Sequence, residues 1–307
     1  MRVTSNTYSN LVINSSQNAQ QQLAQLQQEI STGDSVQFAS DNPVSYQLAS
    51  QDQTSIAQLN AYTTAANVAT TQTSQNNQAM TSIHQILAQA GEYATSVSTT
   101  MSASDLANIG SEMSALVSQL TSVVNQSSNG NYLFGGTSNQ PPITGGTYNS
   151  ATNGQGQTID VQQGNTVQTG IVAGRPGTPP VDGFLYDSTS GVDVLASLKQ
   201  AITDLNSGNA TAVQTTDLPA LNKALDHVSM YVGSSAASMA AVQTATNSLS
   251  QQITSQNNQL NALTQTNLPN VTVQLQQIQT QYQASLEAGA KILGLSMLNY
   301  IGSVPTP

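Results

Sequence analysis

The sequence of 307 residues contains no cysteine, no tryptophan and only three phenylalanines. Without cysteine the chain can form no disulfide and offers no thiolate to a metal ion. Aromatic residues make up 4% of the chain and hydrophobic residues 37%, so a thick globular core is not expected. Thin helical bundles, in which each helix buries only one stripe of side chains, fit this composition better.

Charge is also scarce, because charged residues make up 7% of the chain against about 25% in an average protein. Five scattered basic residues face fifteen acidic ones, and the net charge is −10. Nucleic acids and anionic membranes attract clustered lysine and arginine, so neither is an expected partner. Carboxylates titrate near about pH 4, and this surface has few of them. We therefore expect it to change little on acidification, as would suit an acidic habitat.

Long hydrophobic runs are missing as well. No segment approaches the roughly 20 apolar residues of a membrane span, and residues 1–10 lack the basic start and apolar run of a signal peptide. We therefore expect no membrane insertion. A protein of this kind that leaves the cell would use a route without a cleaved signal peptide.

Apolar residues at three- and four-residue steps predict helices over most of the chain. The spacing predicts helices at about 7–30, 43–101, 104–129, 192–205, 221–263 and 270–300, with Ser104 as the N-cap of the third. At 1.5 Å per residue the second helix would be about 85 Å long, which indicates a rod. The short break before the third helix predicts that it folds back antiparallel to the second.

The segment between the first two helices carries helix-end signals. Gly33 suits the left-handed conformation that ends many helices. Asp41 or Asn42 is a good N-cap for the second helix, and Pro43 fits a first helical turn, where its missing N–H is not needed. We therefore predict a loop and helix cap made by Gly33, Asp41, Asn42 and Pro43.

The middle of the chain has a different pattern, rich in glycine and proline. Ile159 and Val161 alternate with polar residues, as do Val167 and Ile171, around a turn at 163–165, which predicts a β-hairpin. The chain is thus predicted to be mainly α, a long antiparallel coiled-coil rod with a small β-rich insertion and terminal assembly helices. The predicted divisions are 1–43 (assembly helix and loop), 44–136 (rod), 137–190 (insertion), 191–266 (rod) and 267–307 (assembly helix).

No arrangement of residues indicates catalysis or metal binding. His84 and His227 lie on separate predicted helices without spaced partners, and polar packing is the favoured interpretation for both. Asp182, Asp187 and Asp193 do not follow the spacing of a calcium loop, so a solvated loop is favoured there. No nucleophile elbow or phosphate-binding glycine loop occurs. We predict neither an enzyme nor a bound cofactor or metal.

The apolar stripes at the two ends of the chain are more informative. A single helix of about 25 residues cannot bury such a stripe by itself and is only marginally stable alone. Each stripe therefore needs either the other end of the chain or a neighbouring subunit, and we favour assembly over an ordinary intramolecular bundle. The predicted assembly interface comprises Val12, Leu23, Leu26, Ile30, Val271, Leu275, Ile278, Tyr282, Leu286, Ile292, Leu295 and Leu298.

Three motifs in order resemble the flagellin superfamily. They are residues 31–43, similar to its S-T-G-x-R-[IV]…A-x-D-D-P loop; residues 129–136, similar to N-x-x-Y-[LI]-F-[GA]-G; and the tail at 282–301. Within the superfamily the tail resembles the hook-associated protein of the hook–filament junction, the FlgL type. Asn42 replaces the family's second aspartate, the usual Arg or Lys of the loop is absent, and Pro269 stands where acidic residues are expected.

The resemblance implies a structural adaptor ring that joins the hook to the filament outside the cell. Its partners would be like subunits, the first hook-associated protein, flagellin and a flagellar export chaperone. The residues at the junction of rod and insertion would be Tyr132, Leu133, Phe134, Gly135 and Gly136. Three alternatives stay open: flagellin itself, an enzyme carried in the insertion, and a secreted coiled-coil translocator.

Overall fold

The computed structural model describes residues 5–128, 130–152 and 154–302. The fold is mainly α with small strand pairs, which confirms the predicted class. The chain divides into two compact units, one of residues 1–57 with 254–307 and the other of residues 58–253. The helices are α1 (Ser5–Thr32), α2 (Pro43–Ser96), α3 (Ala103–Val124), α4 (Val194–Asn206), α5 (Ala210–Ala212), α6 (Leu218–Thr264) and α7 (Leu268–Gly302).

Among the described residues between α3 and α4, there are four antiparallel strand pairs. They are β1 (Ser127–Ser128) with β2 (Asn131–Tyr132), β3 (Ile143–Thr144) with β4 (Thr147–Tyr148), β5 (Thr158–Gln162) with β6 (Asn165–Gln168), and β7 (Tyr186–Asp187) with β8 (Val192–Asp193). The predicted hairpin is confirmed as β5–β6, with Ile159 opposite Val167 and a bulge between Asp160 and Gln162. It is shorter than predicted, because β6 ends at Gln168 and Ile171 lies beyond it.

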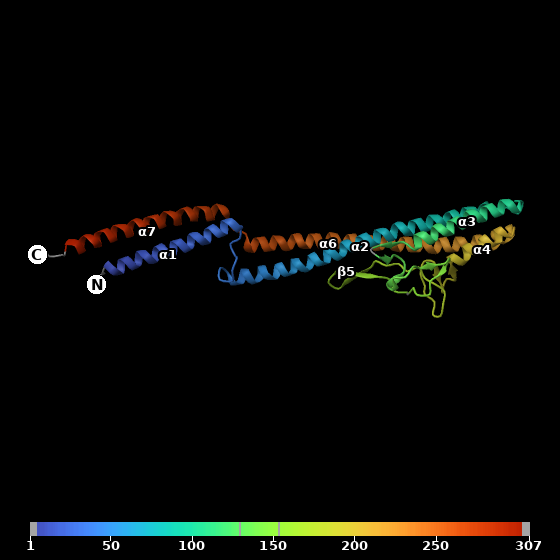
Figure 1. Cartoon of the computed structure of the whole chain (residues 1–307), viewed down its shortest axis with the longest axis horizontal. Coiled ribbons are helices and arrows are strands. Elements are labelled where there is room, and N and C mark those ends of the chain that lie inside the picture. The colour runs from blue at the N-terminus through green and yellow to red at the C-terminus, as the bar shows by residue number, and fades with distance from the viewer. Residues whose placement is uncertain (1–4, 129, 153, 303–307) are drawn as a thin grey trace. The chain divides into compact units, whose positions relative to one another are not determined.

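The second unit is a bundle of α3, α4 and the adjoining parts of α2 and α6, with the strand-rich segment along one side (Figure 1). Its larger core contains Met80 and Leu87 of α2, Met113 of α3, Leu198 of α4 and Val228 of α6. A smaller core joins Ala66 of α2 and Leu249 of α6 to Val161 and Val167 of the β5–β6 hairpin. Each helix therefore buries one stripe, as the composition predicts.

The end of α2 and both ends of α3 differ from the predictions. Helix α2 stops at Ser96 rather than near residue 101, and the N-cap of α3 is Ser102 rather than Ser104. The Ser102 hydroxyl accepts a hydrogen bond from the Asp105 amide at 3.1 Å, which satisfies one of the free N–H groups of the first turn. Ser102 and Ser104 give the same sequence signal, so the sequence alone cannot show which of them is the cap. Helix α3 also ends earlier than predicted, at Val124.

Pro269, which departs from the family pattern, lies in the first turn of α7. There its missing N–H is not needed, and the Asn267 side chain accepts a hydrogen bond from the Asn270 amide at 3.2 Å. The proline therefore begins the last helix, and the interruption falls at residues 265–267.

Asp217 is the last residue of a short π-helical segment, Val213–Asp217, and is almost fully buried. Burial, together with the neighbouring Asp204 carboxylate, raises the pKa of Asp217 to about 6. The folded protein thus takes up a proton on Asp217 at a higher pH than the unfolded chain does, near 4. Its contribution to stability must rise as the pH falls from about 6 to about 4.

We expect the Asp217→Asn variant to be more stable than the wild type at pH 7, because the buried charge is removed. The difference should shrink toward pH 4, where the wild-type carboxyl is protonated. Thermal melts of both proteins across this range measure the effect. A constant difference in melting temperature at every pH would contradict it.

Candidate assembly interface

Helices α1 and α7 pack against each other as an antiparallel pair within the first unit (Figure 1). Close to the chain ends, Val12 lies next to Gly289, where a Cβ atom added to the glycine would be 3.1 Å from the valine Cγ1. At the other end of the pair, the Thr266 amide donates to the Gly33 carbonyl at 2.9 Å. The terminal stripes are therefore paired with each other in the monomer.

The structure divides the predicted interface into two parts. Most of its described members are buried or half-buried: Val12, Leu23, Leu26, Ile30, Val271, Leu275, Ile278 and Tyr282. Ala19, also buried, lies on the same face of α1. Leu286, in contrast, is about half exposed. Ile292, Leu295 and Leu298 belong to α7, but their side chains lie outside the described part of the structure.

A second set of apolar residues, which the stripe pattern misses, faces outward from the pair. Leu11 and Ile13 of α1 and Val273 of α7 are each more than half exposed. Val273 lies with Gln277 and Gln281 on an open, nearly flat surface of α7. In the sequence these residues appear only as aliphatic residues near the apolar stripe. A search for one stripe per helix does not select them. This outer face is made of aliphatic and carboxamide groups.

In the loop between α1 and α2, Gly33 follows the end of α1 and Pro43 begins α2. Gly33 has a φ of +79° and its amide donates to the Glu29 carbonyl at 2.9 Å, closing α1. The Asn42 side chain accepts from the Ser45 amide at 3.1 Å and is the cap of α2. Asp41 instead accepts from the Gln37 and Phe38 amides, at 3.0 and 2.9 Å. The two candidates for the cap thus have different tasks.

The loop is joined to the segment between α6 and α7 by backbone hydrogen bonds. Asp34 pairs with Gln265 in an antiparallel bridge, and the Ser35 amide donates to the Thr264 carbonyl at 2.6 Å. These hydrogen bonds therefore join the segment before α2 to the segment after α6. They hold the base of the α1–α7 pair together.

The Phe38 and Gln37 amides, which donate to the Asp41 carboxylate, hold its pKa below the ordinary value. A lowered pKa means that this stabilisation is present above the unfolded pKa of about 4 and is lost as the pH falls through the folded value. We expect the Gln37 and Phe38 amides to lose protection from hydrogen exchange on strong acidification and in Asp41→Ala at neutral pH. An Asp41→Ala variant with wild-type protection would contradict this role.

The residues predicted at the junction of helices and insertion form a tight core. Phe134 is fully buried, and its ring packs edge-on against Phe184 with centroids 4.9 Å apart. Leu133 is buried beside it, and the Phe134 carbonyl accepts from the Ala173 amide at 3.1 Å. A Cβ atom on Gly135 would lie 2.5 Å from the Gln140 carbonyl oxygen, so only glycine fits there.

The remaining junction residues complete the turn. Tyr132 is half-buried at the end of the β1–β2 pair, and Gly136 has a φ of +64°, which favours glycine. The motif thus anchors the strand-rich segment to the bundle. Sequence reasoning found this motif only through the family resemblance, because its spacing alone gives no sign of burial.

The polar side chains weighed as possible catalytic groups are used in structural contacts. The Asp193 side chain caps α4, accepting from the Ala196 amide at 2.9 Å. His227 is buried against the loop at 182–190, and His84 is half-buried on α2. Among the described residues no three His, Cys, Asp or Glu side chains gather as a metal site would require. Within the same residues, no helix has the length and apolarity of a membrane span.

A comparison with known protein families shows what the chain is similar to. The model of the bacterial flagellin N-terminal helical region matches residues 3–139, which include two of the three motifs. Over these residues the chain is similar to the flagellin family. The resemblance predicted from the motifs is thereby confirmed. The family that the chain resembles is structural rather than enzymatic, in agreement with the prediction of no catalytic activity.

Several solved structures share this fold. FlgL of Bacillus cereus is 20% identical, with a TM-score of 0.55 over 67% of this chain and 96% of that one. The flagellar junction protein FlgL of Legionella pneumophila is 13% identical, with a TM-score of 0.56 over 71% of this chain and all of that one. FlgL of Xanthomonas campestris is 14% identical, with a TM-score of 0.52 over 66% and 99%. No curated protein matches at the level of sequence.

Proposed function

We propose that the chain is a structural subunit of the bacterial flagellum, an adaptor that joins the hook to the filament. The observation that carries the proposal is the likeness to FlgL over nearly the whole of those chains, combined with a flagellin-type N-terminal region. One of those proteins is described as the flagellar junction protein. The paired terminal helices, with their outward aliphatic residues, are the part suited to assembly.

In this role the α1–α7 pair docks against the same pair in neighbouring subunits. Leu11, Ile13, Val273 and Leu286 are exposed in the monomer, and their burial between subunits would drive assembly by the hydrophobic effect. Burying one such aliphatic side chain contributes about 1.5–3 kcal/mol. The partners are like subunits in a ring, the first hook-associated protein on the hook side and flagellin on the filament side.

Before assembly the chain would reach the outside of the cell through the flagellar export channel, accompanied by an export chaperone. The complete absence of cysteine suits such a route, because no disulfide can form before the chain has been exported. The site of action is then the extracellular flagellum.

Assembly through the terminal pair should depend little on salt. Helix α1 contains one charged residue, Glu29, and α7 contains two, Glu287 and Lys291. Screening acts on charges, so raising sodium chloride from about 0.1 to about 0.5 M should change the assembled fraction less than about twofold. Sedimentation at the two salt concentrations measures this fraction. A large loss of assembly at the higher concentration would contradict an interface of neutral groups.

Flagellin itself is the alternative, favoured by the matching family model, which describes the flagellin N-terminal region. The two functions differ in self-assembly. A junction adaptor should remain as small oligomers when the purified chain is salted out, whereas a filament subunit should polymerise without limit. Long filaments in electron micrographs of the purified chain would favour flagellin and overturn the junction proposal.

A further inference from the structure

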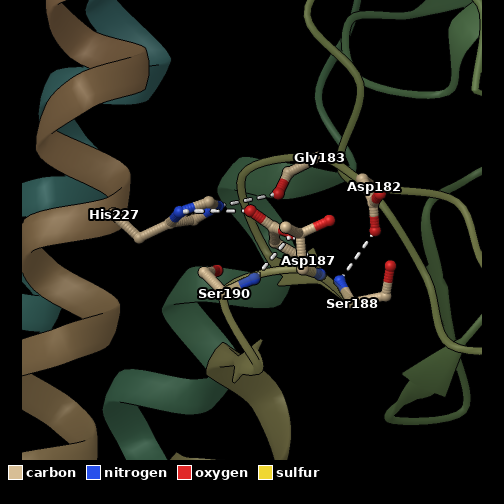
Figure 2. Close-up of polar contacts among 7 residues, drawn as sticks. Asp182, Gly183, Asp187, Ser188, Ser190 and His227 are labelled. Carbon is tan, nitrogen blue, oxygen red and sulfur yellow. Dashed lines mark hydrogen bonds and ion pairs between the residues drawn. The ribbon is translucent and has the colours of Figure 1, made fainter.

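The imidazole of His227 lies between helix α6 and the loop at residues 182–190 (Figure 2). Only 4% of the residue is exposed, although it is one of two histidines in a chain poor in charge. Its Nε2 atom is 3.1 Å from the Gly183 carbonyl oxygen. A carbonyl can only accept, so Nε2 carries the hydrogen and donates it to Gly183.

Within the described part of the chain, the opposite ring nitrogen has no hydrogen-bond partner. In the neutral ring Nδ1 is a bare lone pair, and it is buried and 3.9 Å from the Asp187 Oδ2 atom. Both atoms are acceptors, so no hydrogen lies between them. The other oxygen of Asp187, Oδ1, accepts from the Thr189 and Ser190 amides at 2.7 and 3.1 Å. The carboxylate is thus fixed by its own loop and has one oxygen left for the histidine.

The loop is held firmly on the side away from the helix. A Cβ atom on Gly183 would lie 2.3 Å from the Val172 carbonyl oxygen, and the Phe184 amide donates to that carbonyl at 3.1 Å. The Asp182 carboxylate accepts from the Ser188 amide at 2.7 Å, closing the loop on itself. The loop therefore presents the Gly183 carbonyl and the Asp187 carboxylate to α6 as one preformed surface.

Of the charged groups on the two elements that enclose the imidazole, the Asp187 carboxylate favours a positive charge there and the Lys223 ammonium opposes it. Asp182 and Asp187 come from the loop, while α6 contributes Asp226 beside His227 and Lys223 one turn before it. The ring of Tyr231 lies 5.2 Å from the imidazole, and burial, helped by Asp187 and Asp182, raises the pKa of its phenol, which stays neutral. Burial opposes a charged imidazole, but a carboxylate directly opposite Nδ1 offsets that cost.

We propose that His227 is a proton-operated clamp, in which a proton taken from water onto Nδ1 forms a charge-assisted hydrogen bond to Asp187 and fastens the loop onto α6. An N–H bond forms at Nδ1 as an O–H bond of a hydronium ion breaks and leaves water, and Nε2 keeps its hydrogen bond to Gly183. The strand-rich insertion is consequently held more tightly in acid than at neutral pH. Such a clamp would hold the exposed part of the protein in place in an acidic surrounding.

Asp187 remains able to serve the clamp in mild acid. Burial raises the pKa of its carboxyl, but the hydrogen bonds from Ser190 and Thr189 and the nearby His227 outweigh burial, so the pKa lies below the ordinary value. The carboxylate is therefore still charged at about pH 5 and can accept a hydrogen bond from a protonated Nδ1.

Hydrogen exchange of the Ser188, Thr189 and Ser190 amides in the full-length protein tests the clamp. After correction for intrinsic rates, we expect about tenfold more protection at about pH 5 than at about pH 7.5, as a charge-assisted hydrogen bond would give. His227→Gln can still donate to Gly183 but takes up no proton, so its protection should be the same at both pH values. A wild-type protein without the gain, or a His227→Gln variant that keeps it, would overturn the proposal.

Two matched variants separate the clamp from general effects of pH. Asp187→Asn keeps the oxygen that accepts from Thr189 and Ser190, and its amide can donate to the neutral Nδ1. We expect it to be protected already at pH 7.5 and to gain nothing at pH 5. His84→Gln removes the other histidine of the chain and should keep the full wild-type gain. Loss of the gain in His84→Gln would assign the effect to that residue and overturn the proposal.

Discussion

Replacing Phe134 by alanine should lower the free energy of unfolding of the second unit by about 3–5 kcal/mol. The ring is fully buried and packs edge-on against Phe184, which in turn contacts the ring of Tyr231 on α6. Alanine would leave a cavity at the point where the strand-rich segment meets the helices. The loss includes both the transfer of the ring from water and the contacts that surrounding atoms cannot recover.

The effect can be measured by urea denaturation followed by circular dichroism. Phe38→Ala is the matched control, because Phe38 is 58% exposed and its replacement should change the free energy by less than about 0.5 kcal/mol. If Phe134→Ala were as stable as the wild type, the junction motif would not be the anchor of the insertion.

The double substitution Ile13→Asp with Val273→Asp should abolish assembly without unfolding the monomer. Both side chains are more than half exposed in the structure, so the free energy of unfolding should change by less than about 1 kcal/mol. In the proposed assembly they are buried between subunits, and two buried aspartates without partners would reduce the affinity by more than about 100-fold. Filaments per cell, counted by electron microscopy in a complemented deletion strain, measure the result.

Two matched exposed residues of the second unit serve as the control. Val68 and Met230 are 54% and 64% exposed, and Val68→Asp with Met230→Asp introduces the same two charges away from the terminal helices. This variant should support a normal number of filaments. Equal amounts of each variant must be exported, as measured in the culture medium. Normal filament counts with the Ile13 and Val273 substitutions would exclude the outward face of the α1–α7 pair as an assembly surface.

The helices could be predicted from the sequence because each buries one stripe of side chains, and a single stripe leaves a periodic trace. The apolar stripe of α2 is interrupted by polar residues that make contacts of their own. The Asn76 side chain, for example, donates to the Thr169 carbonyl and so joins α2 to the insertion. Helix ends were predicted less well, because Ser102 and Ser104 are equally good caps as residues but only one lies where the turn begins.

Neither the proposed outward assembly face nor the proposed histidine clamp could be predicted from the sequence. Leu11, Ile13 and Val273 differ from seam residues only in the direction in which their side chains point, which depends on how α1 and α7 pack. The His227–Asp187 contact joins positions 40 residues apart in sequence, and no local pattern specifies it. The loop that carries Asp187 is held by close backbone contacts at Gly183. These contacts exist only once the insertion has folded.

The most direct test of the junction role is electron microscopy of the source bacterium after deletion of the gene for this chain. The proposed function predicts cells with hooks that carry no filaments, with flagellin released into the medium, and restoration of filaments by the wild-type gene. Cells that still carry filaments attached to their hooks would contradict it.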